Sequence, residues 1–365
     1  MGKSIFLIAG LLAGCVFGLT SASAEPAATE GNIVLPDFHF ADGEILPQLR
    51  NHYRTLGTPR RNANGEIDNA VLILHSSGST GAQFLRPAFA DVLFGPGQPL
   101  DIKRYYLILP DAIGHGGSSR PSDGLHMRFP AFGYDDMVAA QREALSHGLG
   151  VRHLRLVLGT SLGCGNTFLW ATRYPGAADA YMPLACLPAE IAGQNRVWRR
   201  AAIDAIKADP AWHGGDYRAQ PPQGMRAAIS LQMIAAGIGP WAMARDYPTR
   251  AAADAYFDER FARDMATLDA NDLIYQLEAS ARYNPGAELA HVAAPLTWVN
   301  FADDSINLPG SRQAADLAVR IPGGHFVVIP ATEETRGHST HSLPRFWKDE
   351  LIALLARSEP AARRP

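Results

Sequence analysis

A serine flanked by glycines, in a turn between an expected strand and an expected helix, constrains this chain more than any other feature. The motif G-x-S-x-G occupies residues 159–163, with Ser161 at its centre. It directly follows an apolar run at residues 154–158 and precedes a helical run at residues 166–174. In this context the motif forms a sharp turn that lifts the serine hydroxyl above a sheet, and its small residues let strand and helix approach. The helix N-terminus beneath the turn stabilises nearby negative charge, so Ser161 is the expected nucleophile.

Short apolar runs recur along the chain and predict the strands of a buried sheet. They lie at residues 71–74, 105–109, 154–158, 296–299 and 326–329. Apolar runs of this length, bounded by turn formers, are typical of parallel strands that are covered on both faces. A helix-length segment at residues 134–147 separates two of these runs. Alternating strands and helices predict an α/β architecture, with a mostly parallel central sheet flanked by helices.

The alternation stops between residues 187 and 290. This region has helical spacing and is interrupted at residues 209–210, 214–215 and 221–222. We interpret it as a helical cap inserted over the edge of the sheet, where pockets form. The core would then comprise residues 25–186 and 291–365. In the alternative interpretation, the inserted helices only cover the sheet. Three tryptophans of this region could give a pocket an apolar lining, and they are Trp198, Trp212 and Trp241.

The N-terminus has the pattern of a secretory signal peptide. Lys3 is followed by an apolar run at residues 5–19 and by Ala-Ser-Ala at residues 22–24. A run of about fifteen apolar residues is shorter than the roughly 20 that a membrane span needs. We therefore expect residues 1–24 to be cleaved and the protein to be periplasmic or secreted, with no stable membrane span. An uncleaved anchor and a lipoprotein acylated at Cys15 are the alternatives.

Composition argues against several other classes of protein. The 33 basic and 36 acidic residues nearly balance, and no long run of like charge suggests a nucleic-acid surface. The glycines at residues 114–117 lack the spacing of a phosphate-binding loop. The sequence contains neither H-E-x-x-H nor paired C-x-x-C motifs, so we expect no metal and no cofactor. The expected partner is a small molecule.

Cleavage of the signal would leave two cysteines, Cys164 and Cys186. Export makes a disulfide between them chemically possible. The sequence does not supply their separation, and two free, buried cysteines are the favoured interpretation.

A nucleophilic serine needs a base, and the base needs an orienting carboxylate. With this turn, the partners follow the serine in the order acid then histidine, each at the end of a strand. The apolar run at residues 296–301 leads into Asp303 and Asp304. One of these two aspartates is the expected acid, and the spacing alone leaves the choice open.

The base should follow the last expected strand, at residues 326–329. His325 precedes that strand and is therefore at the wrong end. His338 and His341 both follow it, and Gly337 gives the backbone freedom directly before His338. We expect His338 to be the base, with His341 as the alternative.

Two backbone N–H groups should stabilise the oxyanion. One belongs to Leu162, which follows the nucleophile, and the other to the loop after the strand that ends at His75. We expect Ser77 in that loop to be the second donor. His75 and His115 follow other strands and fit structural or pocket-lining roles better than the role of base.

The chain resembles the homoserine O-acetyltransferase branch of the α/β-hydrolase superfamily over roughly residues 38–354. Beyond the turn at Ser161, the segments that carry the resemblance are residues 201–206, 209–212, 214–217 and 269–273. The resemblance implies the α/β-hydrolase fold with a cap. It assigns the acid to Asp304, which stands a few residues before a proline, and the base to His338 of a Gly-His pair.

The chain departs from this branch at places that bear on its reaction. Its acyltransferases usually carry a Tyr-Arg pair in the cap, which the matching residues 233–237 lack. Their Met-Gly-Gly-Met after the serine is Leu-Gly-Cys-Gly at residues 162–165. An exported protein would also be separated from cytoplasmic acetyl-CoA. These differences favour a hydrolase of carboxylic esters or amides over an acyltransferase, which is the second hypothesis. An inactive binding protein is the third.

Overall fold

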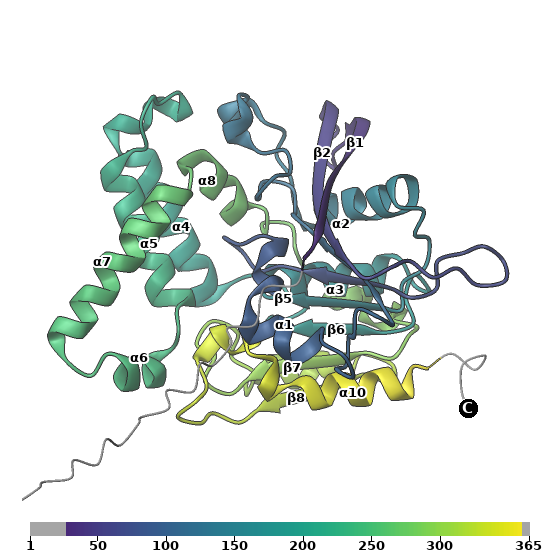
Figure 1. The fold of residues 1–365 in the computed structure, drawn as a ribbon. Coiled ribbons are helices and arrows are strands. Elements are labelled where there is room, and N and C mark those ends of the chain that lie inside the picture. Colours follow the sequence, from purple (N-terminus) through teal and green to yellow (C-terminus); the bar gives the residue numbers. More distant parts are fainter. Residues whose placement is uncertain (1–26, 360–365) are drawn as a thin grey trace, which may run out of the picture.

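A mixed sheet of eight strands forms the centre of the molecule in the computed structural model, which describes residues 27–359 (Figure 1). The expected signal peptide at residues 1–24 and Cys15 lie outside this range. The strands are β1 (Thr29–His39), β2 (Ile45–Leu56), β3 (Ala70–Leu74), β4 (Tyr106–Pro110), β5 (Leu156–Thr160), β6 (Tyr181–Leu184), β7 (Thr297–Phe301) and β8 (His325–Ile329). Their order is β1-β2-β4-β3-β5-β6-β7-β8. β1 and β2 form an antiparallel hairpin, β2 is antiparallel to β4, and the remaining neighbours are parallel.

Helices cover both faces of the sheet. Those of the core are α1 (Pro87–Leu93), α2 (Tyr134–Glu143), α3 (Leu162–Arg173), α9 (Arg312–Ala318) and α10 (Lys348–Arg357). Side chains of α2, α3 and α9 pack in one hydrophobic cluster, and those of α1 and α10 pack in another. Strand β3 shows why two layers form, since Leu72 belongs to the first cluster and its neighbours Val71 and Ile73 belong to the second.

The α/β-hydrolase fold expected from the sequence is confirmed. The five apolar runs overlap β3, β4, β5, β7 and β8, and the run at residues 154–158 begins two residues before β5. The expected helix at residues 134–147 is α2 followed by a π-helical turn, Ala144–Gly148. The hairpin β1–β2 was not predicted, because its apolar residues are mixed with exposed polar ones. β6 was not predicted either, because it has only four residues and includes Pro183, and proline argues against a strand.

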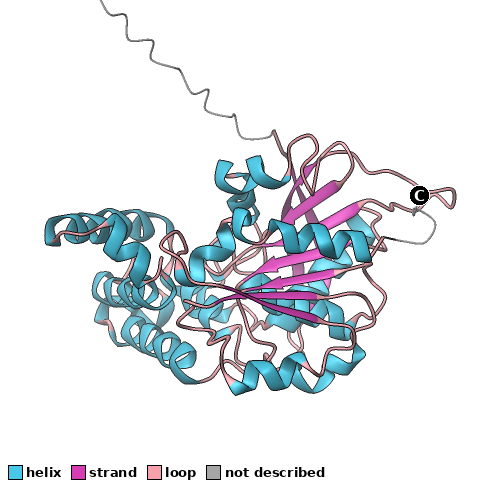
Figure 2. Cartoon of the chain, turned by 90° about the horizontal axis from the view of Figure 1, so that it is seen from below, coloured by secondary structure: helices cyan, strands magenta, loops and turns pink. Residues whose placement is uncertain are grey.

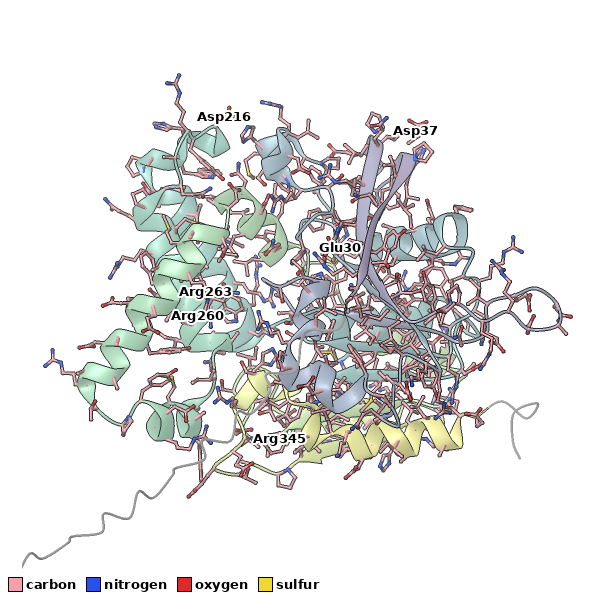
Figure 3. The ribbon with its side chains drawn as sticks, viewed as in Figure 1. Glu30, Asp37, Asp216, Arg260, Arg263 and Arg345 are labelled. Carbon is pink, nitrogen blue, oxygen red and sulfur yellow. A yellow bond between two sulfur atoms is a disulfide. The ribbon has the colours of Figure 1, made fainter. Side chains whose placement is uncertain are left out.

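Five helices between β6 and β7 form the cap, on one side of the sheet (Figure 2). They are α4 (Gly193–Ala208), α5 (Pro222–Ala236), α6 (Pro240–Asp246), α7 (Arg250–Thr267) and α8 (Ala270–Glu278). The cap has its own hydrophobic cluster, built mainly by α4, α5 and α8. Helix α7 buries no residue, and Arg260 and Arg263 mark its position in Figure 3.

No single helix within residues 27–359 combines the length and the apolar composition of a membrane span. By those two criteria alone α5 and α6 would qualify as a pair, but the chain bends by 100° between them.

A buried carboxylate joins the cap to the core. Asp272 on α8 accepts hydrogen bonds from the backbone N–H of Ser122 (2.9 Å) and from its hydroxyl (2.7 Å). The guanidinium of Arg120 lies 3.7 Å from the same carboxylate, whose side chain is only 5% exposed. Burial raises the pKa of Asp272 from 3.8 to about 6. The contact between cap and core is therefore sensitive to protonation.

We expect Asp272→Asn to flatten the pH dependence of stability between pH 4 and pH 6. The folded state binds this proton more tightly than the unfolded state, so the contribution of Asp272 is full below its unfolded pKa of 3.8 and is lost as pH rises through about 6. A shift of roughly two units corresponds to about 3 kcal/mol. Urea unfolding at pH 4, 5, 6 and 7 measures how the free energy of unfolding depends on pH, and Asp204→Asn, at an exposed position, is the control. Equal pH slopes in wild type and Asp272→Asn would contradict it.

Candidate active site

Ser161 stands in a sharp turn between β5 and α3. Its backbone has φ 54° and ψ −108°, a conformation that a side-chain-bearing residue adopts only when its surroundings enforce it. A Cβ atom on Gly159 would lie 2.0 Å from the carbonyl oxygen of Gly163, and one on Gly163 would lie 2.2 Å from that of Leu74. The two glycines of the motif are therefore required by the close approach of strand and helix.

His338 connects Ser161 to Asp304 in a hydrogen-bonded line. Its Nε2 lies 2.9 Å from Oγ of Ser161, and its Nδ1 lies 2.7 Å from Oδ2 of Asp304. Both partners of this second bond are buried, with 6% of His338 and 2% of Asp304 exposed. The tautomer that fits both bonds carries its proton on Nδ1, which donates to the carboxylate, and leaves Nε2 to accept from the serine hydroxyl.

Asp304 is held as a carboxylate despite its burial. Burial by itself raises the pKa of a carboxyl group, but the charge of His338 and the hydrogen bonds from His338, Asn307 and the N–H of Ile306 lower it more. The net pKa of Asp304 is below its ordinary value. Its Oδ1 accepts from the N–H groups of Ile306 (3.0 Å) and Asn307 (3.2 Å), which fixes the direction of Oδ2 toward His338.

Asp303 contacts the loop that carries His338, not the imidazole itself. Its Oδ2 accepts from the hydroxyl of Thr335 (2.7 Å) and from the N–H of Gly337 (2.9 Å). Gly337 has φ 54°, in the left-handed region that favours glycine. In this structure Asp304 contacts the imidazole, whereas Asp303 contacts the loop that carries His338.

The other histidines near the sheet edge are engaged elsewhere. His341 packs edge-on against His338 at 5.2 Å between ring centroids, and burial lowers its pKa to about 3. Nδ1 of His75 donates to the carbonyl of Ser76 (2.9 Å), and its Nε2 accepts from the N–H of Ala112 (2.9 Å). His115 is likewise buried, and its pKa is lowered to about 3 by burial. Within residues 27–359, none of the three is hydrogen-bonded to Ser161.

The two N–H groups expected to form the oxyanion hole have no acceptor among residues 27–359. Leu162 is the first residue of α3, and its N–H is unbonded, whereas the N–H of Gly163 donates to the carbonyl of His75 (3.0 Å). The N–H of Ser77 is unbonded as well. The loop of Ser77 is tied to the serine turn through Gln83, whose side-chain amide donates to Thr160 Oγ1 (3.0 Å). Leu162 also lines the cavity beside Ser161, whereas Ser77 is not among its lining residues, so the role of Ser77 as second donor stays a prediction.

Cys164 and Cys186 form a disulfide, so the expectation of two free cysteines was wrong. Cys164 lies in the first turn of α3 and Cys186 lies just after β6, with 5.9 Å between their Cα atoms. Adjacent parallel strands, β5 and β6, bring the two residues to the same edge of the sheet. Because β6 was not predicted, their separation could not be deduced from the sequence.

Removing this disulfide should lower stability by about 3 kcal/mol, the chain-entropy value for a closed loop of this size. The bond spans 22 residues and ties α3 to the loop after β6. Thermal unfolding of Cys164→Ala/Cys186→Ala, compared with oxidised and reduced wild type, measures the loss. The double variant should unfold at a lower temperature than oxidised wild type and be insensitive to reductant. An unchanged Tm would contradict a stabilising role.

A cavity of about 240 Å³ opens beside Ser161 and His338. Its lining includes Tyr134 at the start of α2, Tyr283 after the cap, and Arg199 of α4. No pattern in the sequence pointed to these three, because they come from separate segments that only the fold brings together. The three tryptophans expected to supply an apolar wall are not among the lining residues. Trp198 is buried in the cap cluster, the indole N–H of Trp212 donates a hydrogen bond to Asn271, and Trp241 is exposed.

Known proteins are similar to this chain in sequence and in fold. Residues 69–238 match the family described as alpha/beta hydrolase fold. The homoserine O-acetyltransferase of Thermobifida fusca is 33% identical over 317 residues, which cover 83% of this chain and 71% of that protein. That of Pelobacter propionicus is 29% identical over 322 residues, covering 78% of this chain and 84% of the relative.

Two solved structures have the same architecture. The homoserine O-acetyltransferase of Bacillus anthracis superposes with a TM-score of 0.77 at 21% identity, covering 90% of this chain and 97% of that one. An acetylester hydrolase of Corynebacterium glutamicum gives 0.76 at 23% identity, covering 90% and 96%.

The sheet, the serine turn and the matched family define an α/β hydrolase. Within that superfamily, the chain belongs to the branch of homoserine O-acetyltransferase-like proteins. Within residues 27–359, no group of three or more His, Cys, Asp or Glu side chains is arranged to hold a metal ion.

Proposed function

We propose that the protein is a serine hydrolase that cleaves carboxylic esters through an acyl-enzyme on Ser161. The observation that carries the proposal is the hydrogen-bonded line from Ser161 through His338 to Asp304, at the wall of a cavity that can admit a small ester. A serine hydroxyl becomes nucleophilic when a neutral imidazole accepts its proton and a carboxylate stabilises the resulting cation.

The reaction would proceed in two stages. Oγ of Ser161 attacks the ester carbonyl while Nε2 of His338 takes its proton, and the N–H groups of Leu162 and Ser77 stabilise the oxyanion. His338 then gives the proton to the departing alcohol, which leaves an acyl group on Ser161. Water, deprotonated by the same Nε2, attacks the acyl group and releases the acid and free Ser161. Asp304 holds the imidazolium during both stages.

Acyl transfer to an alcohol is the second candidate, and the observation in its favour is the similarity to homoserine O-acetyltransferases. The two activities share the acyl-enzyme and differ in the acceptor that resolves it. We favour water because residues 233–237 lack the Tyr-Arg pair expected of the acyltransferases.

We further propose that the protein is exported. Residues 1–24 have the charge, apolar run and small-residue site of a signal peptide. The disulfide between Cys164 and Cys186 also supports export, since such bonds persist in oxidising compartments. Mass spectrometry of the mature N-terminus tests this, and a start at Glu25 is the expected result.

Fluorophosphonate labelling of purified mature protein tests the central proposal. We expect one adduct, located by mass spectrometry on Ser161 and lost in Ser161→Ala and in His338→Ala. Short-chain p-nitrophenyl esters should then be hydrolysed without an added acceptor. If acetyl-CoA and homoserine are supplied, faster formation of acylated homoserine than of free acetate would favour the acyltransferase. A folded protein without any adduct would favour an inactive binding protein.

A further inference from the structure

Arg199 is a buried cation on the wall of the cavity that contains Ser161. Only 5% of the residue is exposed. Its Nε donates to Oδ1 of Asn195 (3.0 Å), and its guanidinium carbon lies 5.0 Å from the ring centroid of Trp198 and beside the hydroxyl of Tyr134. Its Nη1 is buried and has no hydrogen-bond partner among residues 27–359. The guanidinium therefore retains unused donors.

The carboxylates near Arg199 are committed elsewhere. Glu278 pairs with Arg196, one turn earlier on α4, at 3.2 Å. Among residues 27–359, Glu190 is the one carboxylate in the cavity lining, and it is solvent-exposed. Arg199 forms no ion pair with a carboxylate of the described chain, and burial lowers the pKa of its guanidinium. Arginine nonetheless stays protonated in proteins. The Tyr134 hydroxyl and the charge of Glu278 act on Arg199, but no carboxylate within residues 27–359 forms an ion pair with it, so the cavity wall carries a positive charge without a direct anionic partner.

A buried, unpaired charge opposes folding unless a partner reaches it. The planar guanidinium matches the two oxygens of a carboxylate, and hydrogen bonds between charged partners are stronger than neutral ones. A single guanidinium balances one carboxylate, whereas a doubly charged phosphate would leave negative charge in the cavity. We propose that Arg199 binds a carboxylate of the substrate, so that the preferred substrates are esters that carry a free carboxylate. This inference rests on the proposed hydrolase function and names its substrate class.

The carboxylate can belong to either half of the ester. In mono-4-nitrophenyl succinate it is on the acyl half, and hydrolysis consumes one water and gives succinate and 4-nitrophenol. In acetoxyacetate it is on the alcohol half, and hydrolysis gives acetate and glycolate. The matched neutral esters are 4-nitrophenyl butyrate and methyl acetoxyacetate. Comparing kcat/KM within each pair identifies the half that Arg199 recognises.

The test uses Arg199→Met, which removes the charge and keeps a long side chain, and Arg196→Met as the matched control on the same helix. We expect wild type to prefer the anionic ester of at least one pair. In Arg199→Met the ratio of kcat/KM, anionic over neutral, should fall by about 10- to 100-fold, the value of a hydrogen bond to a charged group. Arg196→Met should keep the wild-type ratio. A ratio that is the same in Arg199→Met and wild type overturns the inference.

A binding measurement separates this inference from the proposed function. Succinate or glycolate should raise the Tm of wild type and of Arg196→Met, but not of Arg199→Met. If no ester, neutral or anionic, is cleaved, the proposed function fails, and this thermal shift still decides whether Arg199 binds a carboxylate. If Arg199→Met does not fold, Arg199→Gln replaces it, since glutamine also removes the charge but keeps a polar side chain. Equal shifts in wild type and the Arg199 variant would refute the site.

Discussion

Ser161→Ala should lower kcat for hydrolysis of p-nitrophenyl acetate by about 10⁶-fold, close to the loss found when the nucleophile of a known serine protease is removed. Alanine lacks the hydroxyl that lies 2.9 Å from Nε2 of His338, so no acyl-enzyme can form. Stability should change little, because Oγ of Ser161 makes no hydrogen bond other than that to His338 among residues 27–359. Initial rates with and without fluorophosphonate pretreatment measure the loss.

The control for this variant is Ser230→Ala. Ser230 lies on α5, where its hydroxyl donates to the carbonyl of Arg226 at 2.7 Å. We expect Ser230→Ala to hydrolyse the ester at the wild-type rate. We also expect wild type to release a burst of one nitrophenol per active site. Residual activity of Ser161→Ala within tenfold of wild type would assign hydrolysis to another group and remove the basis of the mechanism.

The local features of the candidate active site could be predicted from the sequence because each one is fixed by neighbouring residues. The turn at Ser161 follows directly from β5, and Gly159 and Gly163 leave no room for a side chain. His338 likewise follows β8 and sits next to Gly337, whose positive φ favours glycine. Chain order and strand ends were sufficient for these residues, because parallel strands bring their carboxyl ends to one edge of the sheet.

Contacts between distant segments could not be predicted in the same way. The partner of Cys164 depends on β6, which Pro183 conceals in the sequence. The position of Arg199 on the cavity wall depends on how α4 of the cap packs against the core. Helical spacing predicts which face of a helix is buried, but it does not predict which element that face packs against. Asp303 and Asp304 differ by one position, and only the loop geometry shows that one contacts the imidazole and the other the loop of His338.

Asp304→Asn should lower kcat by about 10⁴-fold, whereas Asp303→Asn should cost about tenfold or less. An amide at position 304 can donate to Nδ1 of His338, which then carries its proton on Nε2 and can no longer accept that of Ser161; the same substitution in a known serine protease has an effect of this size. The amide introduced by Asp303→Asn keeps one acceptor for Thr335 or Gly337, so His338 is repositioned but not reprotonated. Rates at saturating p-nitrophenyl acetate, with Tm values to exclude unfolding, distinguish the two variants. The reverse order of effects would mean that Asp303 orients the base in the working enzyme and that the hydrogen bond between His338 and Asp304 is not the productive one.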